Sequence, residues 1–229
     1  MTDLPALLRE KIAPDRGEAV LGQAVPFNPE TWKRWLPEGL WPDELDLLQG
    51  TGKFHRITRD DVFRLSADVD TPAQAVQCYV AACVWGTGAG GIGVARRSRP
   101  LHSRKDAGDR LLESMTTLRE DGAVAAYRRL QKGGDTNLRG LGPAFFTKVL
   151  YFAGWDAAPG PRPLILDRFV VRAFNEQAEL TWRTNWTWTR DQYALYLDTV
   201  ARWASSWATT ADVVERQLFD HGKTLSARR

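Results

Sequence analysis

The stretch Leu138-Arg139-Gly140-Leu141-Gly142-Pro143-Ala144-Phe145-Phe146-Thr147-Lys148 combines a tight turn with the start of a helix. Gly140 and Gly142, one residue apart, let the backbone turn sharply and come close to a binding partner. Pro143 fits the first helical turn, where no amide donor is needed. The free amides of that turn point outward, and the helix dipole favours an anion such as a nucleic-acid phosphate. The candidate contacts to such a phosphate are Gly140, Leu141, Gly142 and Ala144.

Two other interpretations of the turn stay open. It can be a plain connection between two helices that binds nothing. Its backbone carbonyls can also hold a monovalent cation. The turn taken alone indicates a phosphate site without establishing one.

A single carboxylate, Asp167, lies downstream in the apolar run of residues 164–170. Burying a carboxylate is costly unless the group is paired or used in chemistry. The pattern predicts a helix start at Asp167, where the side chain would accept hydrogen bonds from helix amides and stay ionised. The residue is therefore either a structural N-cap alone or a functional carboxylate that also caps the helix.

Outward from these two segments, helical patterns dominate the chain. Thr71 and Gln74 form a capping box that opens a helix ending near Trp85, and this helix is apolar nearly all round. Such a helix belongs in the middle of a bundle. The sequence therefore predicts an all-α fold with at most a small N-terminal sheet, made of residues 20–27 and 53–57. We expect an N-terminal helical and small-sheet segment (1–70) to pack on a helical core (71–229) that contains the hairpin at 138–148.

Glycine marks two further boundaries. Residues 86–93 are glycine-rich, and we interpret them as a loop that could line a pocket, because glycine allows close backbone approach. Gly222 follows the last predicted helix, residues 210–221, at the position of a C-terminal cap. The other helices of the core are predicted at 106–118, 122–131, 167–177 and 190–207.

Together, the hairpin and the Asp167 segment resemble the helix-hairpin-helix (HhH-GPD) DNA glycosylase superfamily. The apolar helix and residues 79–93 resemble the bacterial 8-oxoguanine DNA glycosylase (OGG)-like branch. The resemblance covers residues 135–177 well and extends more loosely back to Thr71. It implies a two-lobed helical fold with the active-site cleft between the lobes. It also implies that Asp167 is the catalytic aspartate, which stabilises positive charge on the sugar as the base leaves and could activate a water.

The resemblance raises the question of a catalytic lysine. Bifunctional members carry one that attacks the sugar and forms a Schiff base. Its position, two residues after the second hairpin glycine, is Ala144 here, and Lys148 follows one turn later. Counting back from Asp167 instead matches Lys148, whose stem could span the offset of about 5 Å. Because an insertion inside a helix would rotate its face, we follow the hairpin count, predict a monofunctional enzyme and keep Lys148 as a candidate for a lyase step.

Charge and length permit DNA binding without requiring it. The 229 residues are 43% hydrophobic and 26% charged, with a net charge of +3 and a sequence pI of about 9.0. Arg96, Arg97 and Arg99 lie in the most basic region, just after the glycine-rich stretch, and are candidate contacts to the DNA backbone. The alternative is a solvated helix face and loop.

A glycosylase must also hold an extruded base between flat or apolar side chains. Four aromatic residues lie near the expected cleft and are candidates for this pocket. The alternative for each of them is ordinary core packing. The candidates are Tyr79, Trp85, Phe145 and Trp155.

Several classes of site and partner are not expected. The two cysteines, Cys78 and Cys83, cannot build an iron–sulfur cluster, and the three histidines show no metal-ligand spacing. No cofactor or metal is therefore expected beyond the possible monovalent cation at the hairpin. The apolar stretch 75–94 is interrupted by glycines and does not predict a membrane span, and acidic residues in the first sixteen positions argue against a signal peptide. We expect a cytoplasmic monomer.

These observations predict a DNA glycosylase that binds double-stranded DNA, flips out a damaged or modified base and hydrolyses its N-glycosidic bond. The resemblance suggests oxidised guanine as the substrate. One alternative is a defence enzyme that excises hypermodified bases from phage DNA. An alternative of another class is a non-catalytic DNA-binding module that keeps the hairpin and has lost the chemistry. The role of Asp167 distinguishes the catalytic hypotheses from the last one.

Overall fold

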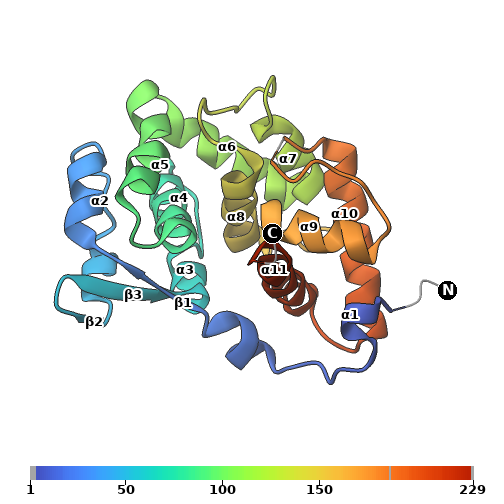
Figure 1. Ribbon diagram of the computed structural model, residues 1–229. Coiled ribbons are helices and arrows are strands. Elements are labelled where there is room, and N and C mark those ends of the chain that lie inside the picture. The colour runs from blue at the N-terminus through green and yellow to red at the C-terminus, as the bar shows by residue number, and fades with distance from the viewer. Residues whose placement is uncertain (1–3, 186, 228–229) are drawn as a thin grey trace.

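Helix α4 (Pro72–Thr87) lies inside the half of the molecule that holds the sheet, between α2 and α8 (Figure 1). It begins with the predicted capping box of Thr71 and Gln74. It packs against α3 (Arg59–Leu65), α6 (Ala107–Asp121) and α8 (Pro143–Gly154). Because α4 meets another element on several sides, a helix that is apolar nearly all round suits this place. The predicted position of this helix in the middle of a bundle is confirmed.

The computed structural model of the protein describes residues 4–185 and 187–227. Most of these residues are helical, and a small sheet near the N-terminus accompanies the helices, as the sequence predicts. Strands β1 (Ala24–Phe27), β3 (Phe54–Thr58) and β2 (Gly50–Thr51) pair antiparallel in the order β1-β3-β2. Within the described ranges, no helix combines the length and the apolar character that a membrane span needs.

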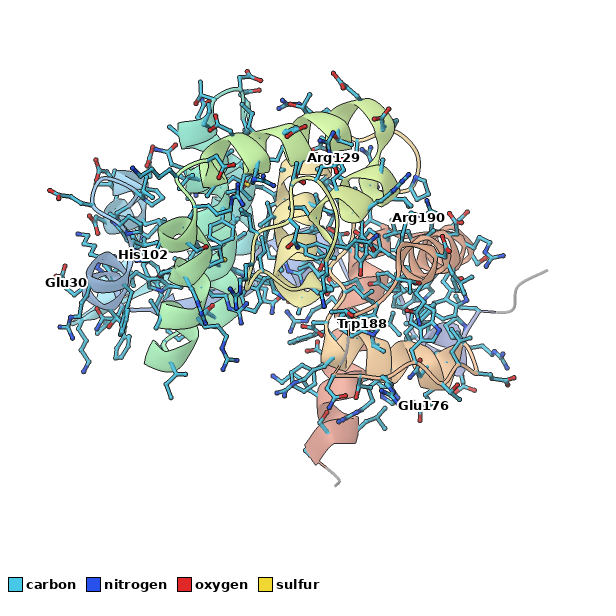
Figure 2. All side chains as sticks on the ribbon, turned by 90° about the horizontal axis from the view of Figure 1, so that it is seen from above. Glu30, His102, Arg129, Glu176, Trp188 and Arg190 are labelled. Atoms are coloured by element: carbon cyan, nitrogen blue, oxygen red, sulfur yellow. The ribbon has the colours of Figure 1, made fainter. Side chains whose placement is uncertain are left out.

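The remaining helices lie toward the two ends of the molecule. In Figure 2, Glu30 on α2 (Pro29–Trp35) lies at one end of the molecule. Glu176 on α9 (Arg168–Gln177) and Arg190, where α10 (Arg190–Ser206) begins, lie at the other end. The sheet lies at the α2 end and α10 at the other, whereas α11 (Ala211–Ala227) lies nearer the middle of the view (Figure 1) and packs against α9 and α10. Between the ends, α7 (Ala123–Leu130) precedes the hairpin.

The N-terminal chain contacts both ends. Its first elements are α1 (Ala6–Arg9) and a π-helix (Gly17–Leu21), and a 3₁₀-helix (Asp43–Leu47) follows α2. The Leu7 amide donates to Gln177 Oε1 on α9 at 3.0 Å. The indole of Trp207, just after α10, donates to the Lys11 carbonyl at 2.8 Å. Residues 4–21 thus cover the α9–α10 end before the chain reaches the sheet, and the proposed segment boundary at residue 70 stays a prediction.

Helix α5 (Gly91–Ser103) was not predicted from the sequence. Gly86 and Thr87 belong to α4 and Gly91 to α5, so the glycine-rich stretch is a short turn and not a loop over 86–93. Gly88, with a φ of +67°, ends α4. The low helix propensity of glycine and an internal proline hide α5, although its buried Val94, Ser98 and Leu101 follow helical spacing.

Gly222 does not cap a helix, because α11 continues through it to Ala227. The residue is buried where α11 crosses α9, and a Cβ placed on it would lie 1.9 Å from the Phe169 carbonyl oxygen. The two helices can approach this closely only because position 222 carries no side chain. The glycine is required by tertiary packing and not by a cap.

We therefore expect Gly222→Ala to lower the free energy of unfolding by about 2 kcal/mol, because backbone atoms cannot move aside as side chains do. Gly90→Ala is the matched control, since nothing lies within 4 Å of a Cβ there and its φ is −78°. That control should change stability by less than about 1 kcal/mol. Urea unfolding of both variants measures the difference, and equal stability of the two would contradict the packing argument.

Candidate active site

The hairpin connects α7 to α8 through residues 131–142. Gly140 has a φ of +94°, a left-handed backbone value that glycine adopts without strain. Gly142 is the N-cap of α8, and its carbonyl accepts the first hydrogen bonds of that helix. Leu138 and Leu141 are buried and anchor the turn. The two glycines lie at the surface beside a groove, as an anion-binding turn requires.

Asp167 is the N-cap of α9, as predicted. Its Oδ1 accepts hydrogen bonds from the amides of Phe169 and Val170 at 2.9 and 3.1 Å. Its Oδ2 lies 3.8 Å from Lys148 Nζ, and the side chain is 13% exposed. The carboxylate therefore has one oxygen fixed by the helix and the other directed to a lysine from the neighbouring helix.

The Lys148 side chain runs back along α8 toward the hairpin. Its Nζ donates to the Ala144 carbonyl, one turn earlier, at 2.8 Å. Helical side chains lean toward the helix N-terminus, so the ammonium group reaches the level of position 144. Gly86 on α4 makes room for the stem, because a Cβ there would lie 2.7 Å from Lys148 Cδ. The one-turn offset seen in the sequence is thus spanned by the side chain.

Two opposing effects set the charge of this amine. Lys148 is buried, and burial lowers the pKa of its amine below the usual value. The carboxylates of Asp167 and Glu215 act in the opposite direction, while Arg59 adds to the lowering. Burial is the larger effect, so a larger fraction of Lys148 is neutral at a given pH than for an exposed lysine.

A groove of about 800 Å³ lies over the hairpin, between α5 and α9. We call it the hairpin groove. Its lining contains four cationic side chains and one carboxylate: Arg97, Lys132, Lys148 and Arg168, with Asp167. The Arg97 guanidinium lies 3.7 Å from the centre of the Phe145 ring, which also lines the groove. The groove therefore combines positive charge with the two glycines of the turn.

A second, smaller cavity of about 390 Å³ adjoins the groove. We call it the inner cavity. The two share Gly86, Lys148, Asp167 and Phe169, so the amine and the carboxylate lie where they meet. The other side chains of the inner cavity that matter below come from both ends of the chain. They are Gln23, Arg59, Trp85, Glu215 and Phe219.

Arg59 and Glu215 form a buried ion pair in the wall of the inner cavity. Arg59 Nη1 lies 2.8 Å from Glu215 Oε2, and each side chain is 1% exposed. The Tyr151 hydroxyl accepts from Arg59 at 3.3 Å and donates to Asp212 at 3.0 Å. Asp212 in turn pairs with Arg16 at 2.8 Å. A hydrogen-bonded chain of this kind compensates for burying charges that would otherwise be very costly.

The structure brings some of the predicted aromatic residues to the cavities and not others. Phe145 lines the hairpin groove and Trp85 lines the inner cavity. Tyr79 is buried, and its hydroxyl donates to the Arg97 carbonyl at 2.5 Å, which joins α4 to α5. Trp155 packs against Tyr151, with the Arg16 guanidinium 4.6 Å from its ring centre, and lies outside both linings.

The predicted basic residues are divided in the same way. Arg97 lines the hairpin groove, and burial lowers the pKa of its guanidinium. Arg96 and Arg99 are exposed on α5 and lie outside the lining of the groove. They are available to a larger ligand that extends past the groove.

Sequence reasoning missed Arg59 and Glu215, although each carried a signal. Arg59 is the first residue of a helix, where the helix dipole disfavours a cation. Glu215 follows Val213 and Val214 and precedes the buried Leu218, so it falls on an apolar face. A charge placed against a local rule is a reason to look for a partner elsewhere in the chain.

The possible metal ligands and the two cysteines of the described part of the chain are further candidates for reactive groups. Among the described residues, no group of three or more His, Cys, Asp or Glu side chains could hold a metal ion. Cys78 and Cys83 are free and buried, and burial raises the pKa of both thiols to about 12. Both thiols therefore remain protonated at neutral pH.

Comparison with known proteins identifies a family. A family model described as "Putative 8-oxoguanine DNA glycosylase OGG-like protein" matches residues 18–219. This span includes the hairpin, Lys148, Asp167 and all the residues of the inner cavity named above. Residues 1–17 and 220–229 lie outside it. Neither the curated proteins nor the solved structures gave a match.

A buried lysine with a lowered pKa predicts a gain in stability when it is replaced. The folded state binds this proton less tightly than the unfolded chain. The cost of burying the charged amine is therefore fully present below the folded pKa and fades as the pH rises from there toward the unfolded pKa. Lys148→Met should therefore raise the free energy of unfolding by about 1 kcal/mol at pH 7 and by less at pH 9.5. Urea titrations at both pH values measure this, with Lys132→Met, at an exposed position, as the control.

Proposed function

We propose that this chain, which belongs to the family of OGG-like 8-oxoguanine DNA glycosylases, excises a modified base from double-stranded DNA at Lys148 and Asp167. Family membership supports DNA glycosylase activity and, with it, DNA binding. The observation that carries the assignment to residues is the 3.8 Å separation of Lys148 Nζ from Asp167 Oδ2. The pair lies where the hairpin groove meets the inner cavity.

The hairpin groove is the proposed DNA-binding surface. The amides at Gly140 and Gly142 suit a phosphate oxygen, and the four cations of the groove add sequence-independent attraction to the backbone. Arg96 and Arg99 extend the positive surface along α5. Phosphate contacts of this kind fix the position of the duplex without reading its sequence.

The inner cavity is the proposed site of the extruded base. It opens beside the pair that would act on the sugar, and its wall combines Trp85 and Phe219 with polar groups. An extruded base is held in this way, by flat or apolar side chains and a few hydrogen bonds. This assigns one of the predicted aromatic residues, Trp85, to the base.

Lys148 is the proposed nucleophile. Its neutral amine attacks the sugar carbon C1′ while the bond from C1′ to the base breaks, and the bonding electron pair leaves with the base. The attacking nitrogen then gives one proton to the departing base. The C1′–O4′ bond of the sugar ring breaks with its electron pair on O4′, which takes the second proton from the nitrogen, and a Schiff base between Nζ and C1′ remains. Asp167 Oδ2 faces the positive charge that builds up on the sugar. The lowered pKa of the buried amine supports this role because only the neutral form attacks.

The proposal departs from the monofunctional enzyme expected from the sequence. That expectation depended on Lys148 lying one turn beyond the hairpin position. The Nζ–Ala144 hydrogen bond of 2.8 Å removes this objection, because the amine itself reaches the required level. A bifunctional enzyme with a lyase step is therefore the hypothesis that the geometry supports best.

We expect Asp167→Asn to lower the single-turnover rate of base release by about 100-fold or more, because an amide cannot stabilise the cationic sugar. The fold should be retained, since asparagine caps helices as well as aspartate does. Asp156→Asn, which removes an exposed carboxylate outside the groove, is the control. An unchanged rate in Asp167→Asn would reject the proposed role of this carboxylate.

Borohydride trapping tests the lysine separately. Wild-type protein should form a covalent complex with substrate DNA when the Schiff base is reduced, and Lys148→Ala should form none. Lys132→Ala, in the same groove but exposed, should still be trapped while binding DNA more weakly. If the wild-type protein releases base but is never trapped, the enzyme is monofunctional.

Base identity is measured by mass spectrometry of the bases released from duplexes carrying oxidised, alkylated and phage-modified residues. Release of 8-oxoguanine would follow the family description. Release of a hypermodified phage base alone would favour the defence alternative. Release of nothing from the whole panel would favour a non-catalytic DNA-binding module.

A further inference from the structure

The Arg59 guanidinium is held rigidly in the wall of the inner cavity. Its Nε donates to Gln23 Oε1 at 2.9 Å. Its Nη1 donates to Glu215 Oε2 at 2.8 Å and to the Tyr151 hydroxyl at 3.3 Å. The charged plane also lies 4.8 Å from the centre of the Trp85 ring. Contacts on three sides fix the orientation of a side chain that would otherwise have many rotamers.

The remaining nitrogen of this fork is unused. Nη2 carries two N–H groups and makes no hydrogen bond to any residue in 4–185 or 187–227. Arg59 is 1% exposed and lines the inner cavity. Nη2 is not one of the fully buried side-chain atoms that lack a partner in the described residues, so it keeps some contact with the cavity that Arg59 lines. A preoriented donor that faces a cavity and is not paired within the protein can bind an acceptor that a ligand supplies.

We propose that Arg59 Nη2 reads a carbonyl oxygen on the buried edge of the extruded base, which makes Arg59 a specificity-determining residue. This rests on the function proposed above, in which the inner cavity receives the base. Arginine has donors only, so the base must present an oxygen or an unprotonated nitrogen to it. Glu215 lies beside Arg59 in the same wall and can accept from an adjacent ring N–H.

This arrangement favours bases that carry a carbonyl next to a ring N–H. Guanine-type and hypoxanthine-type bases present that pair at positions 6 and 1. Adenine-type bases present an amino group and an unprotonated nitrogen in the reverse order, so a donor would face Arg59 and an acceptor would face Glu215. A site built to form a buried hydrogen bond rejects a ligand that leaves its groups unpaired by factors of about 10⁴.

The first test uses the wild-type protein and three duplexes that differ only in the target base: 8-oxoguanine, 8-oxohypoxanthine and 8-oxoadenine. All three share the oxidised five-membered ring, and only the first two have a carbonyl at position 6. Single-turnover release of the first two should agree within about 10-fold, whereas 8-oxoadenine should react at least 100-fold more slowly. Folding cannot confound this comparison, because the protein is the same throughout.

The second test changes the residue. Arg59→Lys keeps a cation beside Glu215 but loses the planar fork, and we expect it to reduce the preference for 8-oxoguanine over 8-oxoadenine by at least 10-fold. Arg16→Lys is the matched control, because Arg16 belongs to the same buried network through Asp212 but lies outside the lining of the inner cavity. Its preference should equal that of the wild type. A merely structural role would lower the rates on both bases together and leave their ratio unchanged.

The outcomes separate the two hypotheses. Equal release of 8-oxoadenine and 8-oxoguanine by the wild type, or an unchanged ratio in Arg59→Lys, would overturn the role of Arg59 and leave the glycosylase in place. Absence of both release and borohydride trapping on all three duplexes would overturn the role of Arg59 together with the proposed oxidised-base activity. Thermal unfolding of both variants identifies any loss of the folded protein.

Discussion

The divided hydrogen bonding of Asp167 connects the fold to the proposed chemistry. One carboxylate oxygen accepts the amides that open α9, and the other lies 3.8 Å from the Lys148 amine on α8. The helix cap fixes the carboxylate in position. The amine is then held at the meeting point of two cavities, because α8, α9 and the glycine of α4 all approach it.

Burial of this pair bears on its proposed chemistry and on the stability of the protein. Taking an amine out of water lowers its pKa, and that change favours the neutral form of Lys148, which the proposed mechanism needs, while it destabilises the folded protein. The same low exposure makes the Arg59–Glu215 pair expensive, and Gln23, Tyr151 and Asp212 compensate with hydrogen bonds. The proposed specificity of the site depends on this network, which draws on residues from both ends of the chain.

Local patterns predicted the elements that local forces build. The capping box at Thr71, the N-cap at Asp167 and the glycine turn at Gly140 all appear where the sequence places them. Helix α5 was not predicted because its glycines and proline lower its helix propensity. In the folded protein, burial of one face of the helix offsets this low propensity. Gly222 resembled a cap, yet the Phe169 carbonyl beside it explains the glycine.

The sequence by itself determined the helical class, the hairpin and the capping carboxylate, because hydrogen bonds between residues two to four apart depend on local order alone. Only the tertiary structure decided the rest. Lys148 reaches its place because its stem folds back over one turn beneath a glycine of α4. Arg59 meets Glu215 across 156 positions of the chain. A contact of that range depends on how the helices pack, and no spacing in the sequence encodes it.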